Sequence, residues 1–304
     1  MPPELENEGQ HVQTVFPPDD ALGGPGYFAF NPLAHMTEAH ALATPASRAR
    51  LEAEWGAHWD ASKGVLLEKS PSNLLRARFL QALWPDCHFV FIVRHPLAHA
   101  YASAAWGTAH AGKGALAPDA VADFVEHWLH AHALLKARAR AIRRAIRRAI
   151  LARNSAARNA TARRPARLAA QADLPHLRNV TLVHLEDFAA DPQPAVDAIY
   201  GALGLPSCAV PEGKVTKDVN AKYAREWRRE ASALRERIAS MEPAMRAMQY
   251  DLSGTFRPLG PPLAPAALPN GHANGHAHDR DGTGTDASAY AYSHRFVVGD
   301  EVCY

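Results

Sequence analysis

The sequence has few of the features that mark membrane-inserted or disulfide-stabilised proteins. No run of about 18 apolar residues occurs, so no membrane span is encoded. The three cysteines, Cys87, Cys208 and Cys303, show no Cys-x-x-Cys spacing, which favours a reducing compartment or inert thiols over a disulfide framework. The segment Met1–Gln10 is acidic and polar, unlike a signal peptide. With 304 residues, 47% of them hydrophobic, the chain can form one sizeable core.

Acidic residues are missing from one long stretch. Between Arg138 and Ala170 there are eleven arginines and no acid, and removing them from the net charge of +2 leaves −9. The remainder is therefore acidic, and we expect neither general polyanion binding nor a nucleic-acid partner. Ile142, Ile146 and Ile150 predict one basic amphipathic helix in this stretch. It is interpreted as a solvated insertion, with an anionic surface such as RNA, membrane or sulfated glycan as the alternative.

The end of the chain has too little apolar density to fold, since it is first Pro/Ala-rich and then His/Gly/Asp-rich. Its histidines at 272, 276 and 278 are better explained by low complexity than by metal binding, so we expect no metal site. The predicted organisation is one domain built from two portions, with an insertion between them and a tail after them. These are the N-terminal portion (residues 1–137), the Arg/Ala-rich insertion (residues 138–172), the C-terminal portion (residues 173–257) and a disordered tail (residues 258–304).

Two strand-to-helix passages carry the clearest chemical signal. Val65–Leu67 predicts a buried strand that ends at Lys69, and Ser70-Pro71 then predicts a capped helix over Leu74–Leu83. His88–Val93 predicts a second strand that ends at Arg94, with a helix opening at Pro96. Ligands of parallel sheets bind beyond the carboxyl ends of the strands, so Lys69 and Arg94 predict an anion site.

A third predicted strand, Asn179–Leu185, is followed by Glu186-Asp187 and by a helix from Asp191 to Gly204. Strands alternating with helices indicate the α/β class. We therefore expect a three-layer parallel sheet with helices on both faces. Further along, Tyr223 and Trp227 are four residues apart, which favours an amphipathic helix, and Met241–Leu252 predicts a terminal helix.

The string LLEKSPSNLLRARFLQALWPDCHFVFIVRHPLAHAYAS, residues 66–103, resembles the sulfotransferases that use 3′-phosphoadenosine 5′-phosphosulfate (PAPS), a family with a P-loop-like architecture. The resemblance implies that Arg94 and Ser103 hold the 3′-phosphate of the nucleotide. The family places its serine eight residues after the arginine, whereas Ser103 comes at nine. It also implies PAPS as co-substrate, no metal, and an acceptor with a hydroxyl or amine, such as a carbohydrate or protein.

One departure from the family is large: no phosphate-binding loop after a strand precedes Glu4. The glycines at 23, 24 and 26 follow Pro17-Pro18-Asp19-Asp20 rather than a strand, so they do not qualify. We expect either that the sequence begins partway into its domain or that it is a catalytically inactive nucleotide-, anion- or glycan-binding relative. The expected location is cytoplasmic as written, or the Golgi lumen if an N-terminal anchor has been lost. A P-loop kinase-like enzyme is disfavoured, because a Walker lysine and a magnesium carboxylate are missing.

Sulfuryl transfer needs a cation at the bridging oxygen, donors at the phosphates and a base for the acceptor. The resemblance assigns the first role to Lys69, which with Ser70 can reach the phosphosulfate. Glu8 lies in the segment that matches the family's acidic position and is the predicted base. The second choices are His11 and His95. Glu68 is interpreted as a buried partner, and Asn73 and Arg76 as ordinary first-turn and surface residues.

Overall fold

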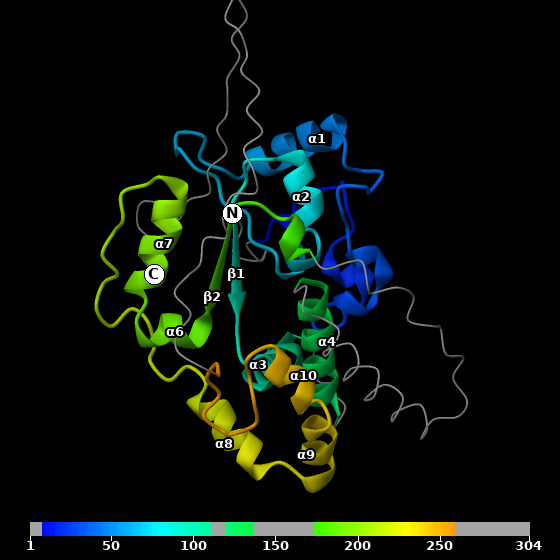
Figure 1. Cartoon of the computed structure of the whole chain (residues 1–304). Helices are drawn as coiled ribbons and strands as arrows, with labels where there is room; N and C mark the ends of the chain where they lie inside the picture. Colours follow the sequence, from blue (N-terminus) through cyan, green and yellow to red (C-terminus); the bar gives the residue numbers. More distant parts are fainter. Residues whose placement is uncertain (1–7, 111–118, 136–172, 260–304) are drawn as a thin grey trace, which may run out of the picture.

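The computed structural model describes residues 8–110, 119–135 and 173–259 (Figure 1). The predicted insertion 138–172, and all but the first two residues of the predicted tail, lie outside the described residues. Two parallel strands stand at the centre, with helices around them. The strands are β1 (Phe89–Val93) and β2 (Val180–His184). The helices are α1 (Pro45–Gly56), α2 (Ala77–Leu83), α3 (Pro96–His110), α4 (Ala120–Leu135), α6 (Leu185–Ala190), α7 (Gln193–Leu203), α8 (Ala221–Arg229), α9 (Ser232–Ala239) and α10 (Glu242–Ala247). The 3₁₀ turns are η1 (Gly9–His11), η2 (Asp19–Leu22), η3 (Phe28–Phe30), η4 (Pro32–Ala34), η5 (Pro71–Leu75) and η7 (Leu174–His176).

The parallel pairing of β1 and β2 confirms the predicted α/β class. The register runs from Phe89 opposite Val180 to Val93 opposite His184. Parallel neighbours require a long crossover between them, and here the chain passes through α3 and α4 before it returns to β2. Both strands end at the same edge of the sheet, so the residues that follow them, Arg94 among them, come together there.

The first predicted strand is not formed. Val65 makes a single bridge, and the chain from Leu66 to Ser70 is irregular. No described strand lies beside this segment to complete a ladder, and Leu67 is 48% exposed. A strand buried on both faces needs hydrogen-bonded neighbours as well as apolar side chains, and the sequence pattern reports only the side chains.

The two faces of β1 differ in their cover. Phe89, Phe91 and Val93 are buried, whereas Val90 is 38% and Ile92 is 64% exposed. On the neighbouring strand, both α6 and α7 pack against β2. Helices therefore cover the buried face of β1 and pack against β2, while the complete three-layer arrangement stays a prediction.

Two hydrophobic cores fix the strands in place. One core joins α3 and α4 to the C-terminal helices, with Trp128, Trp227 and Tyr250 among its largest members. The other packs Phe89 and Phe91 of β1 against α1 and α2. None of the described helices combines the length and hydrophobicity needed to cross a bilayer.

Local signals explain where several helices begin and end. Thr44 caps α1 by accepting a hydrogen bond from the Ser47 amide, as N-cap threonines do. Helix α7 ends at Gly204, which has a φ of 66° that glycine adopts without strain. Tyr223 and Trp227 are both buried on α8, which confirms the amphipathic helix. The predicted terminal helix is shorter than expected, because α10 covers only Glu242–Ala247.

Candidate functional site

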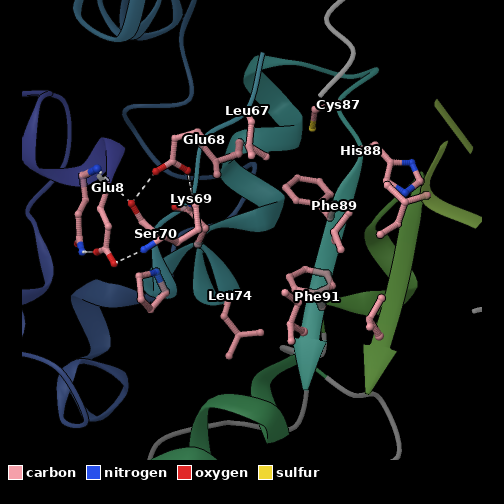
Figure 2. A pocket seen from close by; sticks show the side chains of 18 of the residues that line it. Glu8, Leu67, Glu68, Lys69, Ser70, Leu74, Cys87, His88, Phe89 and Phe91 are labelled. Carbon is pink, nitrogen blue, oxygen red and sulfur yellow. Dashed lines mark hydrogen bonds and ion pairs between the residues drawn. The ribbon is translucent and has the colours of Figure 1, made fainter. Parts of the chain in front are cut away.

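A single cleft of about 1930 Å³ gathers all the predicted site residues. It extends from the irregular segment before η5 to the carboxyl end of β1, and Figure 2 shows Lys69 and Ser70 on one side and Phe89 and Phe91 on the other. The predicted residues that line it are Glu8, Lys69, Ser70, Arg94 and Ser103. They come from three separate regions of the chain, so the fold brings together what the sequence separates.

Glu8 and Lys69 form an ion pair although 61 residues separate them. Lys69 Nζ donates to Glu8 Oε1 at 2.6 Å, and Gln10 Nε2 donates to the other carboxylate oxygen at 2.6 Å. The lysine side chain is 63% exposed and that of Glu8 only 11%. The flexible cation can therefore leave the pair to meet an anion in the cleft, while the carboxylate stays fixed.

Ser70 is buried beside this pair. Its hydroxyl accepts a hydrogen bond from the Gln10 amide at 3.1 Å and donates to Glu68 Oε1. It stands at the N-cap position of η5 but makes no capping bond with its side chain, so that element of the prediction is wrong. The Ser70 hydroxyl donates its hydrogen bond to the neighbouring Glu68 carboxylate instead.

Glu68, interpreted from the sequence as a buried partner, is half-buried. It accepts hydrogen bonds from Ser70, from the Asn73 amide and from the Gly9 backbone. Burial raises the pKa of Glu68, and these hydrogen bonds oppose that shift. Asn73, expected to be an ordinary first-turn residue, thus helps to fix the floor of the cleft.

Arg94 lines the cleft directly after β1, and Ser103 lines it from the middle of α3. Arg94 is half-buried, and its guanidinium carbon lies 5.1 Å from the centre of the Tyr223 ring. Lys222 Nζ lies 4.6 Å from the same centre, which adds a second positive charge near Arg94. Ser103 Oγ lies 3.4 Å from Nε2 of His99. Burial, followed by the Arg94 charge, lowers the pKa of His99 to about 4, so this ring is neutral near pH 7.

The two alternative bases differ in position. His11 lines the cleft 3.9 Å from Glu8. His95 is fully buried: its Nε2 bonds the Asp251 carbonyl at 2.8 Å, and its Nδ1 accepts from the Leu97 amide. Because both ring nitrogens are engaged, His95 cannot take a proton from an acceptor.

Residues 20–151 match the model of the Sulfotransferase family. This stretch carries a sulfotransferase domain. No curated protein and no solved structure matches the chain.

The match includes four of the predicted site residues of the sulfotransferase domain, Lys69, Ser70, Arg94 and Ser103. Glu8 precedes it and meets the domain through its contact with Lys69. Among the described residues, no group of three or more histidine, cysteine or acidic side chains could hold a metal ion.

The prediction that Arg76 is a surface residue is wrong, because its side chain is fully buried. Its guanidinium donates to Ser72 Oγ at 2.8 Å and to the Pro17 carbonyl at 2.9 Å. It lies 3.8 Å from the Asp19 carboxylate and 4.6 Å from the centre of the Phe16 ring. The one available sequence signal is the spacing of Ser72 and Arg76, which places them on the same face of a helical turn.

Replacing Gly9 with alanine is expected to disturb the cleft floor. A Cβ at Gly9 would lie 2.5 Å from Cγ of Glu68, whose carboxylate is held by Ser70 and Asn73. Overpacking of this kind costs about 1–3 kcal/mol, which urea unfolding followed by circular dichroism will measure. Gly64→Ala is the matched control, since no atom lies within 4 Å of its Cβ. Equal stability of the two variants would contradict the prediction.

Proposed function

We propose that this chain binds PAPS in the cleft and transfers its sulfuryl group to a hydroxyl or amine of an acceptor. The observation that carries the proposal is the convergence of Glu8, Lys69, Ser70, Arg94 and Ser103 on one cleft. The family match supports sulfuryl transfer in general. PAPS as the donor rests on the resemblance of residues 66–103 to enzymes that use it.

In the proposed reaction the acceptor oxygen or nitrogen attacks sulfur as the bond from sulfur to the bridging phosphate oxygen breaks. The negative charge that develops on that oxygen needs a cation, and Lys69 is exposed enough to supply it. When Lys69 turns to the donor, Glu8 loses its ion-pair partner and becomes available to accept the proton of the acceptor. The products are the sulfated acceptor and 3′-phosphoadenosine 5′-phosphate.

Arg94 is proposed to hold the nucleotide, whereas Lys69 and Glu8 take part in the transfer itself. A guanidinium binds a phosphate through two parallel hydrogen bonds, and Arg94 lines the cleft at the carboxyl end of β1. Ser103, one helical stretch later, is proposed as a second donor to the same 3′-phosphate. The acceptor itself would occupy the apolar region of the cleft near Phe89 and Phe91.

The test is a calorimetric titration of the purified chain with 3′-phosphoadenosine 5′-phosphate. We expect saturable binding that weakens at least tenfold in Arg94→Ala, because a hydrogen bond to a charged group contributes about 1.5–3 kcal/mol. Arg50→Ala, on the exposed side of α1, should bind like the parent chain. Failure of the folded parent chain to bind would refute the proposal, and binding without sulfuryl transfer would indicate an inactive nucleotide-binding relative.

A further inference from the structure

The guanidinium of Arg94 is held by residues more than a hundred positions later in the chain. Arg94 Nε donates to Asn220 Oδ1 at 3.0 Å, and Nη2 donates to the Val219 carbonyl at 3.3 Å. A guanidinium has five N–H groups in one rigid plane. Within the described portion of the chain, Nη1 of Arg94 makes no hydrogen bond, which leaves that edge for a ligand.

Asn220 is oriented without ambiguity by its other contacts. It is 5% exposed, and its Nδ2 donates to Glu186 Oε1 at 2.6 Å and to the Phe256 carbonyl at 3.1 Å. Both amide hydrogens are thereby used, so the amide oxygen must face Arg94. An aspartate could not make this set of bonds, because it has no N–H to donate to Glu186.

Helix capping does not explain why asparagine stands here. Asn220 occupies the N-cap position of α8, where its side chain would ordinarily accept a bond from the first turn. It makes no such bond. Its side-chain oxygen accepts a hydrogen bond from Arg94 instead, so the side chain stabilises the position of Arg94 and does not cap its own helix.

Glu186 anchors the arrangement from the carboxyl end of β2. It is 7% exposed, and it also accepts hydrogen bonds from the His95 amide at 2.8 Å and from the Tyr250 hydroxyl at 3.2 Å. Asn220 links this carboxylate to Arg94, since it donates to Glu186 and accepts from the guanidinium. The same contact to the His95 amide fixes the backbone that follows Arg94.

We propose that Asn220, held in place by Glu186, is a positioning residue that directs the Nη1 edge of Arg94 into the cleft for a phosphate monoester. The inference rests on the proposed function, in which that ligand is the 3′-phosphate of the nucleotide. It adds a residue that lies outside the family match of residues 20–151. It predicts that Asn220 contributes to the affinity for nucleotides that carry a 3′-phosphate and not to the affinity for nucleotides that lack it.

The first arm of the test needs no nucleotide. In protein labelled with ¹⁵N-arginine, the Nε–H signal of Arg94, assigned by its loss in Arg94→Lys, should exchange slowly with solvent. It should exchange rapidly in Asn220→Ala. If it exchanges in the parent chain as fast as that of the exposed Arg50, the positioning role is overturned, whatever the chain binds.

The second arm compares 3′-phosphoadenosine 5′-phosphate with adenosine 5′-phosphate by calorimetry. We expect Asn220→Ala to lose about tenfold in affinity for the first and less than twofold for the second. In the Arg94→Lys background, which lacks the planar Nε–H, adding Asn220→Ala should change neither affinity by more than twofold. Equal losses for both nucleotides, or additive losses in the double variant, would mean a merely structural residue and overturn the inference.

The two arms together separate the inference from the function on which it rests. A parent chain that binds neither nucleotide but protects the Arg94 Nε–H would refute the proposed function and leave the positioning of the guanidinium standing. Protection that persists in Asn220→Ala would instead overturn the positioning role and leave nucleotide binding intact.

Discussion

Replacing Arg76 with methionine is expected to lower the free energy of unfolding by about 3–5 kcal/mol, the usual result of removing one partner from a buried charge pair. Methionine nearly fills the space of the arginine, so the loss comes from electrostatics rather than from a cavity. The change deprives the Pro17 carbonyl and Ser72 of their donor and leaves Asp19, which is 3% exposed, without a nearby cation. Burial already raises the pKa of Asp19, and Arg76 opposes that shift.

Urea unfolding at pH 7 measures this effect, and two further variants assign its cause. Arg50→Met on the exposed side of α1 should change stability by less than about 0.5 kcal/mol. Adding Asp19→Asn to Arg76→Met should restore some of the loss, because the uncompensated carboxylate becomes a neutral amide. A loss below about 1 kcal/mol in Arg76→Met would show that the pair adds little to stability.

The sequence predicted the central elements of the fold because their signals are local. Buried apolar runs bounded by a cation and a proline located β1 and the start of α3, and the capping glycine located the end of α7. The segment Val65–Leu67 has the same apolar character and yet forms no strand. Whether an apolar run becomes a strand depends on a hydrogen-bonded neighbour, which lies elsewhere in the chain.

The residues of the candidate site differ in the same way: some could be predicted from the local sequence, and others depend on contacts with distant residues. That Lys69 and Arg94 lie at the cleft could be predicted, because each comes within two residues of the end of an apolar run. The roles of Arg76 and Asn220 could not, since they depend on contacts with Pro17 and Glu186 that no periodicity encodes. The family resemblance assigned Glu8 and Lys69 separate roles, and it did not predict their contact.

Acid is expected to destabilise this protein well above the pKa of ordinary carboxylates, because two buried histidines cannot take up a proton. Burial lowers the pKa of His95 to about 4 and that of His127 to about 3. His127 Nε2 accepts from the Ala29 amide at 3.1 Å, so a proton there would face another N–H group. In the same way, Nδ1 of His95 accepts from the Leu97 amide. The neighbouring Arg94 lowers the pKa of His95 further, although Asp251 opposes this.

The direction of this pH dependence follows from the difference in proton uptake between the unfolded and the native state. In the unfolded chain both histidines have a pKa near 6.5, so below that pH the unfolded state binds protons that the native state does not. Each histidine then removes about 1.4 kcal/mol of stability per pH unit, which amounts to about 4 kcal/mol for the pair between pH 7.5 and pH 5. Glu68 and Glu186 have raised pKa values and act in the opposite direction, whereas His99, whose pKa is also lowered to about 4, acts in the same direction as the pair.

Urea titrations at pH 7.5, 6 and 5 test this dependence, and His127→Gln isolates one contributor. The glutamine carbonyl can accept the Ala29 hydrogen bond without ever taking a proton, so the variant should lose about 2 kcal/mol less than the parent over this range. His58→Gln, at an exposed position, should follow the parent. The same pH dependence in His127→Gln and in the parent would rule out His127 as a source of acid sensitivity. A shallower dependence would instead show that the core around α4 requires an uncharged side chain at position 127.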